Sequence, residues 1–457
     1  MATYSRRDFL KTAGLVGGGL MMSQNPLFAQ AATGKKIGAA DEINVALIGM
    51  GKEGEVLLNN MLQIEGIRFR AVCDIQPMRR RYGAGRIRGI KQDVTKNMYE
   101  DFEEMLEKEA DLDAVIIATP DFWHAPQTIK CLEKGINVYC EKMMSNTIEG
   151  ARSMVRAMRS SGKLCQIGHQ RKSNPRYQFM HDVLLRKLNL CGTITNANGQ
   201  WNRAVAADLM LPANAKLPIE LLNKYGFADE HQFCNWRWFK GLGGGPISDL
   251  GAHQIDIFAW MLGNRPKSIM ASGGLDFYTP ANGFVKRDWE DNVMCIYEYE
   301  TYQKNPARVA YQVLTTTSAG GGYFEQFMGT DGAIKMSENP AITKIFAEGR
   351  PEIAAKWEQH VKDGFLVKGA AVSDKIADSR ETKALAEFGF PKTDIDNLPP
   401  AFIHMPHLVN FFDSIRGKAK LNCDAEHAFE AEAAVFKVRE ALDSGKKLEF
   451  TDADFTA

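Results

Sequence analysis

The sequence predicts an α/β protein with a doubly wound parallel sheet in its first half and an open, mainly antiparallel sheet in its second half. Its 457 residues exceed the size of one ordinary domain. Between residues 43 and 168, short apolar runs alternate with helix-like segments, which indicates parallel strands joined by crossover helices. From residue 193 onward, the strand-like runs alternate apolar and polar side chains, which is typical of a sheet covered on one face.

The first 31 residues have the features of an export signal. Ser5–Lys11 reads SRRDFLK, a twin-arginine pattern, and an apolar stretch of about ten residues follows it. That stretch is too short to span a bilayer, and Ala29–Ala31 supplies the small-x-small pattern of a cleavage site. We therefore expect removal of residues 1–31, export of the folded protein to the periplasm, and no membrane span in the mature chain.

The composition argues against a nucleic-acid partner. Lys and Arg together number 56, as do Asp and Glu, so the formal net charge is zero. A protein that binds nucleic acid carries a clear positive excess. The eight cysteines show no Cys-x-x-Cys spacing and several lie in apolar runs, so we expect buried thiols.

A glycine-rich turn follows the first predicted strand. The apolar run Ile43–Ile48 leads into GMGKEG and then into a helix-like segment. Gly49 permits the tight turn, Gly51 lets the backbone approach a pyrophosphate, and Gly54 allows the helix to pack closely on the strand. This pattern predicts a dinucleotide-binding site.

The second strand identifies the dinucleotide. It ends in Asp74, 20 residues after Gly54, where a carboxylate accepts hydrogen bonds from the ribose hydroxyls of NAD and repels a 2′-phosphate. The predicted cofactor is therefore NAD. The basic stretch 79–89 lies close to the adenosine side and keeps NADP as the less favoured alternative.

We place the nucleotide-binding domain at residues 40–168 and a substrate-binding and oligomerisation domain at 169–457. The charged, interrupted segment 339–400 is interpreted as an insertion, for which a position over the cleft is one interpretation. A helix following His404 is expected to pack back on the core, with His404 itself a further candidate near the cleft. The predicted strands and hairpin of the second domain cover residues 193–201, 268–278, 292–300, 307–317 and 320–338.

Three sequence blocks resemble the Gfo/Idh/MocA family, the group of glucose–fructose oxidoreductase and inositol dehydrogenase. They are GMGKEG (49–54), TPDFWHAPQTIKCLEKGINVYCEK (119–142) and GGGPISDLGAHQID (243–256), in the family's order and approximate spacing. The resemblance covers nearly all of the mature chain. It implies a Rossmann domain, then an α/β domain whose open mixed sheet often forms the subunit interface, and hence a homo-oligomer, either a dimer or a tetramer.

The resemblance also implies roles for individual residues. Lys142 corresponds to the catalytic lysine of the family's Glu-Lys-Pro motif, and Asp249 and His253 to the acid and the histidine of its second-domain motif. The family's proline is replaced by Met143, so we expect the Lys142–Met143 peptide bond to be trans. The predicted cofactor-binding residues are Gly49, Gly51, Gly54, Asp74, Thr119, Pro120, His124 and Glu141.

The spacing of Asp249 and His253 allows three interpretations. Four residues apart, they share one face of a helix with Asp256 and could form a proton-transfer site with Lys142. The same three side chains could instead hold a divalent ion, but ligands on one helix face do not converge closely, so we predict no metal. In the third interpretation Asp249 caps the helix and His253 packs in the core.

Three further residues are candidates for contact with a sugar. Arg237 and Trp238 lie in CNWRWFKGLGGG, which mixes flat apolar faces with hydrogen-bond donors. Arg171 follows a strand and could line the same cleft. Core packing for the tryptophans and helix capping for Arg171 remain equally open.

The expected function is that of an NAD-dependent oxidoreductase acting on a hydroxyl of a sugar or glycoside. Because a periplasm has no recycling pool of free nicotinamide cofactor, export of the folded protein suggests a tightly bound cofactor and a redox-neutral cycle. One alternative is an NAD-dependent glycosidase that works through a transient 3-keto sugar. A second is a non-catalytic sugar-sensing protein.

Overall fold

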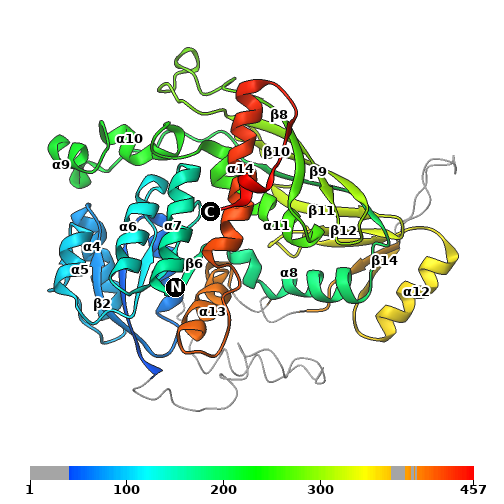
Figure 1. Cartoon of the computed structure of the whole chain (residues 1–457), viewed down its shortest axis with the longest axis horizontal. Coiled ribbons are helices and arrows are strands. Elements are labelled where there is room, and N and C mark those ends of the chain that lie inside the picture. The colour runs from blue at the N-terminus through cyan, green and yellow to red at the C-terminus, as the bar shows by residue number, and fades with distance from the viewer. Residues whose placement is uncertain (1–40, 372–385, 393–395, 397–398) are drawn as a thin grey trace.

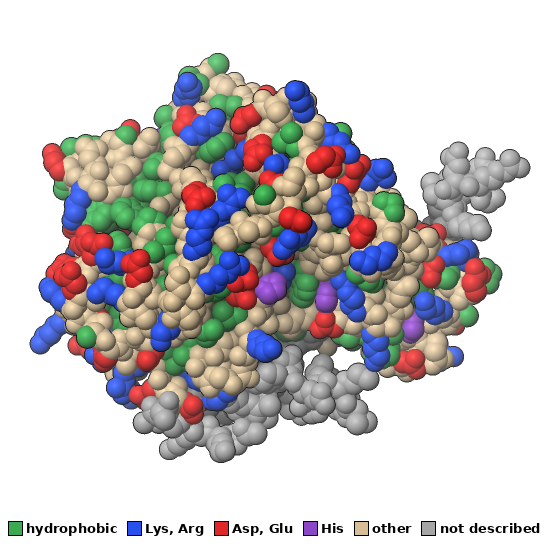
Figure 2. Space-filling model, in the orientation of Figure 1, with side chains coloured by type: hydrophobic (Ala, Val, Ile, Leu, Met, Phe, Trp, Pro, Cys, Tyr) green, Lys and Arg blue, Asp and Glu red, His purple; other side chains and the backbone are tan. Residues whose placement is uncertain are grey.

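The computed structural model describes residues 41–371, 386–392, 396 and 399–457 (Figure 1). The predicted export signal at 1–31 lies outside these residues. Two bodies lie side by side, and the long helix α14 (Ala425–Ser444) runs between them. On the face in Figure 2, basic and acidic side chains are interspersed, in keeping with the balanced composition.

The first body is a six-stranded parallel sheet with the strand order β3-β2-β1-β4-β5-β6. All four residues of β4 and five of the six in β1 are buried, because helices cover both faces of the sheet. This order and the crossover helices are those of a Rossmann fold and confirm the predicted first half. The strands are β1 (Ile43–Ile48), β2 (Ile67–Cys73), β3 (Met98–Tyr99), β4 (Ala114–Ile117), β5 (Asn137–Cys140) and β6 (Cys165–Ile167). The helices are α3 (Lys52–Met61), α4 (Pro77–Arg88), α5 (Phe102–Lys108), α6 (Asp121–Glu133) and α7 (Ile148–Ser161).

The second body is a ten-stranded sheet in the order β14-β15-β13-β12-β11-β7-β10-β9-β8-β16. Every described pairing in it is antiparallel except that of β7 with β10, so the predicted mixed, mainly antiparallel sheet is confirmed. In β9 and β10 buried side chains alternate with more exposed ones, because helices such as α11 and α14 cover one face. The main strands are β7 (Ile194–Asn202), β8 (Pro266–Gly274), β9 (Asn292–Glu300), β10 (Pro306–Leu314), β11 (Tyr323–Gly329), β12 (Gly332–Met336) and β16 (Leu448–Glu449). The helices before the hairpin are α8 (Pro175–Phe179), α9 (Ile219–Lys224), α10 (Glu230–Asn235) and α11 (Ala252–Leu262).

The described part of segment 339–400 enlarges this sheet at the edge far from the first body (Figure 1). β13 pairs with β12, β15 pairs with β13, and β14 pairs with β15. These strands therefore lie at the edge of the sheet and not over the cleft. The reason is that β12 offers a free edge to which the segment adds strands. The elements are β13 (Lys344–Ala347), α12 (Pro351–Lys362), β14 (Val367–Ala371) and β15 (Ala386–Gly389).

Two C-terminal helices return to the first body. α13 (Met405–Ile415) buries Leu408, Phe411 and Phe412 in the same core as β1 and α3. The start of α14 adds Phe429 to the core under β5 and β6, and its later turns join the core of the second sheet. The two bodies therefore share their hydrophobic cores through the last part of the chain.

Two further properties bear on function. Within the described part of the chain, no helix combines the length and the apolar character that crossing a bilayer requires. The eight cysteines all lie in that part and carry free thiols, seven of them buried.

Candidate active site

The carboxyl ends of β1, β4 and β5 face the second body, and most of the predicted site residues gather there. In a doubly wound sheet, ligands bind beyond this edge because the loops that follow the strands diverge and leave a crevice. The start of α11 supplies the opposite side of the crevice.

The glycine-rich turn after β1 fits a pyrophosphate. Gly49 has a φ of +89°, and a Cβ there would lie 2.5 Å from the carbonyl oxygen of Ala118. A Cβ on Gly54 would lie 2.0 Å from the carbonyl oxygen of Gly49, whereas one on Gly51 would meet nothing within 4 Å. The turn is therefore tightly packed at Gly49 and Gly54 but leaves open space at Gly51. This space lies at the N-terminus of α3, where free backbone N–H groups attract phosphate.

Asp74 follows β2 beside this turn. Its Oδ2 accepts a hydrogen bond from the backbone N–H of Met50 at 2.7 Å, and its Oδ1 accepts one from that of Gln76 at 2.7 Å. Burial raises the pKa of Asp74 in spite of these bonds. The carboxyl group therefore stands at the strand end where a ribose would lie, and the donor and acceptor set fits a dinucleotide.

His124 connects two turns at the edge of the crevice. Its Nε2 lies 2.7 Å from the carbonyl oxygen of Thr119, and its Nδ1 lies 2.6 Å from that of Met143. Burial lowers the pKa of His124 to about 4. His124 therefore contacts both the Thr119–Pro120 turn, which begins α6, and the turn that carries Lys142, and its neutral ring donates to one of the two carbonyls.

The Lys142–Met143 peptide bond is cis, so the expected trans bond is wrong. Both neighbouring backbone groups have buried partners that hold the turn. The carbonyl of Met143 faces His124, and the N–H of Met144 donates to both carboxylate oxygens of Glu432 at 2.8 Å. Glu432 lies on α14 and is fully buried.

Lys142 and Asp249 meet across the crevice. The Nζ of Lys142 lies 2.5 Å from the backbone carbonyl oxygen of Asp249 and 3.6 Å from its Oδ1. Asp249 lies on a π-helical turn (Ile247–Gly251) that leads into α11. The lysine comes from the first body and the aspartate from the second, so the site is shared between the two.

Asp249 is surrounded by positive charge. The Nε of Arg237 donates to its Oδ1 at 2.9 Å, and an Nη of Arg203 lies 3.9 Å from its Oδ2. Burial would raise the pKa of Asp249, but Arg237, Lys142 and Arg203 together lower it well below its usual value. Asp249 is therefore a carboxylate throughout the physiological pH range.

His253 and Asp256 differ in their surroundings. His253 is buried beside Trp201, with ring centroids 5.5 Å apart, and its Nδ1 has no hydrogen-bond partner. Burial, and then Lys142, lowers the pKa of His253 well below its usual value, so the ring is neutral near pH 7. Asp256 instead pairs with Lys172 at 3.1 Å. Among the described residues, no group of three His, Cys, Asp or Glu side chains could hold a metal ion.

The three predicted sugar contacts lie in different places. Arg237 is 44% exposed in the crevice. Arg171 is 1% exposed and pairs with Glu325 at 2.6 Å and Glu338 at 3.0 Å, which places it inside the second body. Trp238 packs on Arg287, whose Cζ lies 3.8 Å from its ring centroid.

Two other predicted residues flank the glycine-rich turn. His404 Nε2 lies 3.3 Å from the Oε1 of Glu53, in the first turn of α3. Glu141 is buried next to Lys142, and its Oε1 accepts a hydrogen bond from the hydroxyl of Tyr139 at 3.1 Å.

Three residues at the site were missed from the sequence. Asp121 is a buried carboxyl at the first position of α6, with Lys142 and Arg237 among its electrostatic neighbours, and its place directly after Thr119–Pro120 could have indicated it. Arg203 and Glu432 carry no sequence signal, because each reaches the site only through the packing of β7 and α14.

Family models match both bodies. Residues 43–169 match "Oxidoreductase family, NAD-binding Rossmann fold", and residues 221–335 match "GFO/IDH/MocA C-terminal domain". The chain belongs to the Gfo/Idh/MocA oxidoreductase family. Its first domain is accordingly an NAD-binding domain, as predicted, and NAD is its cofactor.

Several known proteins match different shares of the chain. Inositol 2-dehydrogenase 2 of Saccharopolyspora erythraea is 25% identical over 331 residues, 71% of this chain and 82% of that protein. A 2,7-anhydro-N-acetylneuraminate hydratase of Mediterraneibacter gnavus is 23% identical over 328 residues, 70% and 74% of the two chains. A glycosyl hydrolase family 109 protein of Shewanella pealeana is 29% identical over 176 residues, which span 36% of this chain and 39% of that protein.

Solved structures share the fold. Levoglucosan dehydrogenase in complex with NADH and L-sorbose superposes with a TM-score of 0.66 at 15% identity, covering 90% of this chain and 99% of that one. The WlbA dehydrogenase of Bordetella pertussis, in complex with NADH and UDP-GlcNAcA, gives a TM-score of 0.61 at 16% identity, covering 90% and 98%.

Proposed function

We propose that this protein is an NAD-dependent oxidoreductase that removes hydride from a hydroxyl-bearing carbon of a sugar or glycoside. The observation that carries the proposal is the meeting of Lys142 and Asp249, 3.6 Å apart, at the carboxyl end of β5. Sequence relatives and solved neighbours that act on or hold polyols and sugars support the substrate class.

Oxidation of an alcohol takes a proton from the oxygen and a hydride from the carbon. Bound NAD supplies the hydride acceptor. Lys142 is held by two oxygens of Asp249, so its ammonium polarises the substrate oxygen. His253, whose ring is neutral, is proposed to accept the hydroxyl proton.

The cofactor is proposed to stay bound through a redox-neutral cycle. Residues 203–242, which we call the strap, cross the carboxyl edge of the first sheet. The side chain of Gln76, after β2, donates to the carbonyl of Ala215 at 2.5 Å. The indole N–H of Trp123, on α6, donates to the carbonyl of Tyr225 at 3.2 Å. A segment tied at both places covers the crevice in which a dinucleotide lies.

We further propose that the protein is exported folded to the periplasm by the signal at 1–31, with its cofactor already bound.

It is also proposed to form a homo-oligomer through the open face of the second sheet. On that face Met270 of β8 lies opposite Ile296 of β9, and Met294 lies two residues before Ile296 on β9. The side chains of these three residues are 43% to 52% exposed. Apolar side chains in such a row favour burial against another subunit.

A second candidate is glycoside cleavage through a transient keto sugar. Oxidation of one hydroxyl acidifies the neighbouring C–H, so the aglycone can leave by elimination. Water then adds across the resulting double bond, and the hydride returns from the cofactor to the carbonyl carbon. The matches to glycosyl hydrolase family 109 proteins favour this candidate. A non-catalytic sugar-sensing role is the third and would require that no substrate reduces the bound NAD.

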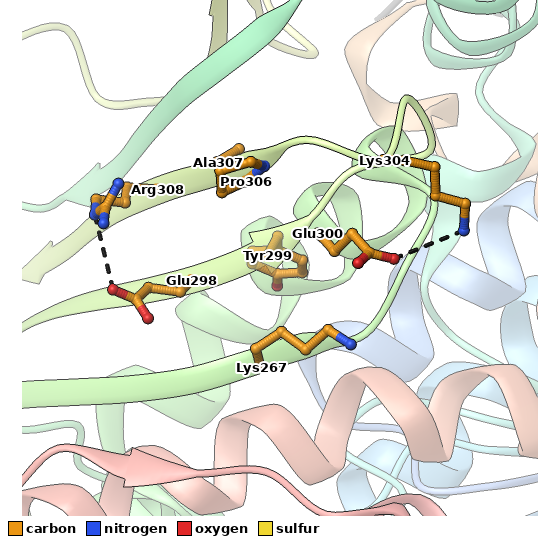
Figure 3. Close-up of a pocket in the computed structure, with 8 residues that line it drawn as sticks. All are labelled: Lys267, Glu298, Tyr299, Glu300, Lys304, Pro306, Ala307 and Arg308. Atoms are coloured by element: carbon orange, nitrogen blue, oxygen red, sulfur yellow. Dashed lines mark ion pairs between the residues drawn. The ribbon is translucent and has the colours of Figure 1, made fainter.

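The experiment is a panel of glycosides and polyols mixed with the purified protein and monitored at the nicotinamide absorbance band. A substrate should reduce bound NAD, and Lys142→Ala should slow this step about 10²- to 10⁴-fold while NAD stays bound. Lys267→Ala, on the exposed outer face of β8, is the matched control (Figure 3). Full activity of Lys142→Ala would remove this lysine from the mechanism, and release of the aglycone would select the hydrolase.

A further inference from the structure

Two half-exposed arginines of the second body flank Asp249 on the crevice side. Arg237 binds Oδ1 of Asp249 and is 44% exposed, and Arg203 lies near Oδ2 and is 52% exposed. Within the described residues, neither guanidinium has an ion pair with any other carboxylate. Most of their N–H groups are therefore available to a ligand.

Both guanidiniums are held by tryptophan rings. The Cζ of Arg203 lies 5.1 Å from the ring centroid of Trp201, and that of Arg237 lies 4.2 Å from that of Trp236. Stacking on an indole fixes the plane of a guanidinium and leaves its N–H edge free for a planar anion. The arrangement is thus preorganised, which reduces the entropy lost on binding.

The charges on this side of the crevice do not balance. Lys142, Arg203 and Arg237 all lie within 4 Å of one carboxylate, that of Asp249, so three positive charges surround one negative charge there. Two carboxyls reduce this excess: Glu53, which interacts with Arg237 from beyond ion-pair distance, and Asp121. Burial raises the pKa of Asp121 to about 7, so Asp121 is ionised only in part at neutral pH. A crevice with low-dielectric walls and excess positive charge attracts an anion.

We propose that the substrate is an acidic sugar, one that carries a carboxylate, and that Arg203 and Arg237 bind that carboxylate. This inference rests on the proposed oxidoreductase function. A guanidinium offers two parallel N–H groups that match the two oxygens of a carboxylate, and charge-assisted bonds of this kind are strong. The hydroxyl to be oxidised would then lie toward Lys142 and His253.

The arginines could bind the pyrophosphate of NAD instead of a substrate carboxylate. Changing Arg203 distinguishes these two ligands. Arg237 interacts electrostatically with Glu53, in the first turn of α3, so it also stands near the phosphate side. Arg203 directly follows β7 and stacks on Trp201, in the second body. Arg203 is therefore the residue to change.

The test compares each methyl uronide with its parent methyl glycoside, a pair that differs only in a carboxylate at C6. We expect the uronide of the productive sugar to have the lower KM. Arg203→Gln should raise that KM about 10- to 100-fold more than it raises the KM of the neutral partner, and should leave the NAD release rate unchanged. Arg68→Gln is the matched control because Arg68 is 55% exposed, pairs with Glu42, and lies at the start of β2, opposite to the carboxyl edge of the sheet.

The outcomes are distinguishable. A neutral glycoside that reduces NAD as well as its uronide, with Arg203→Gln without effect, overturns the acidic-sugar class and leaves the proposed function standing. Faster NAD release from Arg203→Gln also overturns it, because the arginine then serves the cofactor. Failure of every sugar, neutral or acidic, overturns the proposed function itself.

Discussion

Glu141 is a buried carboxyl at the end of β5, and its surroundings oppose ionisation. Burial, and then the charge of Glu53, raises the pKa of Glu141 to about 8. A carboxyl whose pKa is raised in the folded state stabilises the fold at low pH, and this contribution is lost as the pH rises through the folded value. The free energy of unfolding therefore falls as the pH rises from the ordinary glutamate pKa of 4.5 up to about 8, and the last part of this fall lies between pH 7 and pH 8.

Glu141→Gln should remove this dependence, because glutamine has the shape of the protonated acid and cannot ionise. We expect the wild-type free energy of unfolding to fall by about 1 kcal/mol more than that of the variant between pH 7 and pH 8. Denaturant unfolding of protein freed of NAD measures the difference. Glu103→Gln, an exposed carboxylate on α5, is the control, and equal pH slopes in all three proteins would contradict the prediction.

The motif residues of the site could be predicted from the sequence, and their partners could not. Lys142 and Asp249 each lie in a family motif, and the resemblance implied that the two motifs share one site. Glu432 lies in an alanine-rich helical segment with other glutamates, and nothing in the sequence distinguishes it from them. Its contact with Met144 spans 288 positions and depends on how α14 crosses the first body. Motif spacing carries no information about such a crossing.

The strap is held on the first body by its own small hydrophobic core. Phe227 is 2% exposed and packs edge-on against Phe122 of α6, with ring centroids 5.4 Å apart. Truncating a buried phenylalanine costs about 3–5 kcal/mol, and here the loss falls on the contact between the strap and α6. Phe227→Ala should therefore favour opening of the strap.

We expect Phe227→Ala to release NAD about 10- to 100-fold faster than wild type, because opening precedes release. The measurement is the loss of nicotinamide absorbance from purified protein during exchange into cofactor-free buffer. Phe388→Ala is the matched control, since Phe388 is equally buried but lies on β15, far from the crevice. Purified protein that holds no NAD, or an unchanged release rate, would overturn the retained-cofactor proposal.

Strands with a clear apolar or alternating pattern were predictable, and the short helices of the strap were not. The apolar run 43–48 has the bounds of β1, and the alternating run 292–300 has those of β9. A strand buried on both faces is apolar throughout, whereas a strand buried on one face alternates apolar and polar residues. The strap helices α9 and α10 have six residues each. Helices this short are stable only through tertiary contacts. The placement of segment 339–400 failed for the same reason, since strand addition at a sheet edge depends on the neighbour.

The two bodies should unfold as one. Leu408, Phe411 and Phe412, from α13, are each fully buried in the core of the first body, although more than 230 residues separate them from β6. A fragment limited to residues 40–168 would expose that apolar surface. We expect the isolated fragment to show no cooperative thermal transition by circular dichroism.

The full chain carrying Phe412→Ala provides the matched measurement. We expect a loss of about 3–5 kcal/mol in the free energy of unfolding, in one transition observed by both circular dichroism and NAD binding. A fragment 40–168 that melts cooperatively, or two separate transitions in the full chain, would show that the first body is an independent domain.

The bond from the N–H of Met144 to Glu432 also has a meaning for synthesis of the chain. A ribosome completes the glycine-rich turn, the lysine and the second-domain motif well before it reaches α14. A nascent or truncated chain can therefore contain every motif of the family and still lack the carboxylate that anchors the lysine turn. The lysine turn therefore gains its anchor only after α14 has been synthesised and packed on the first body.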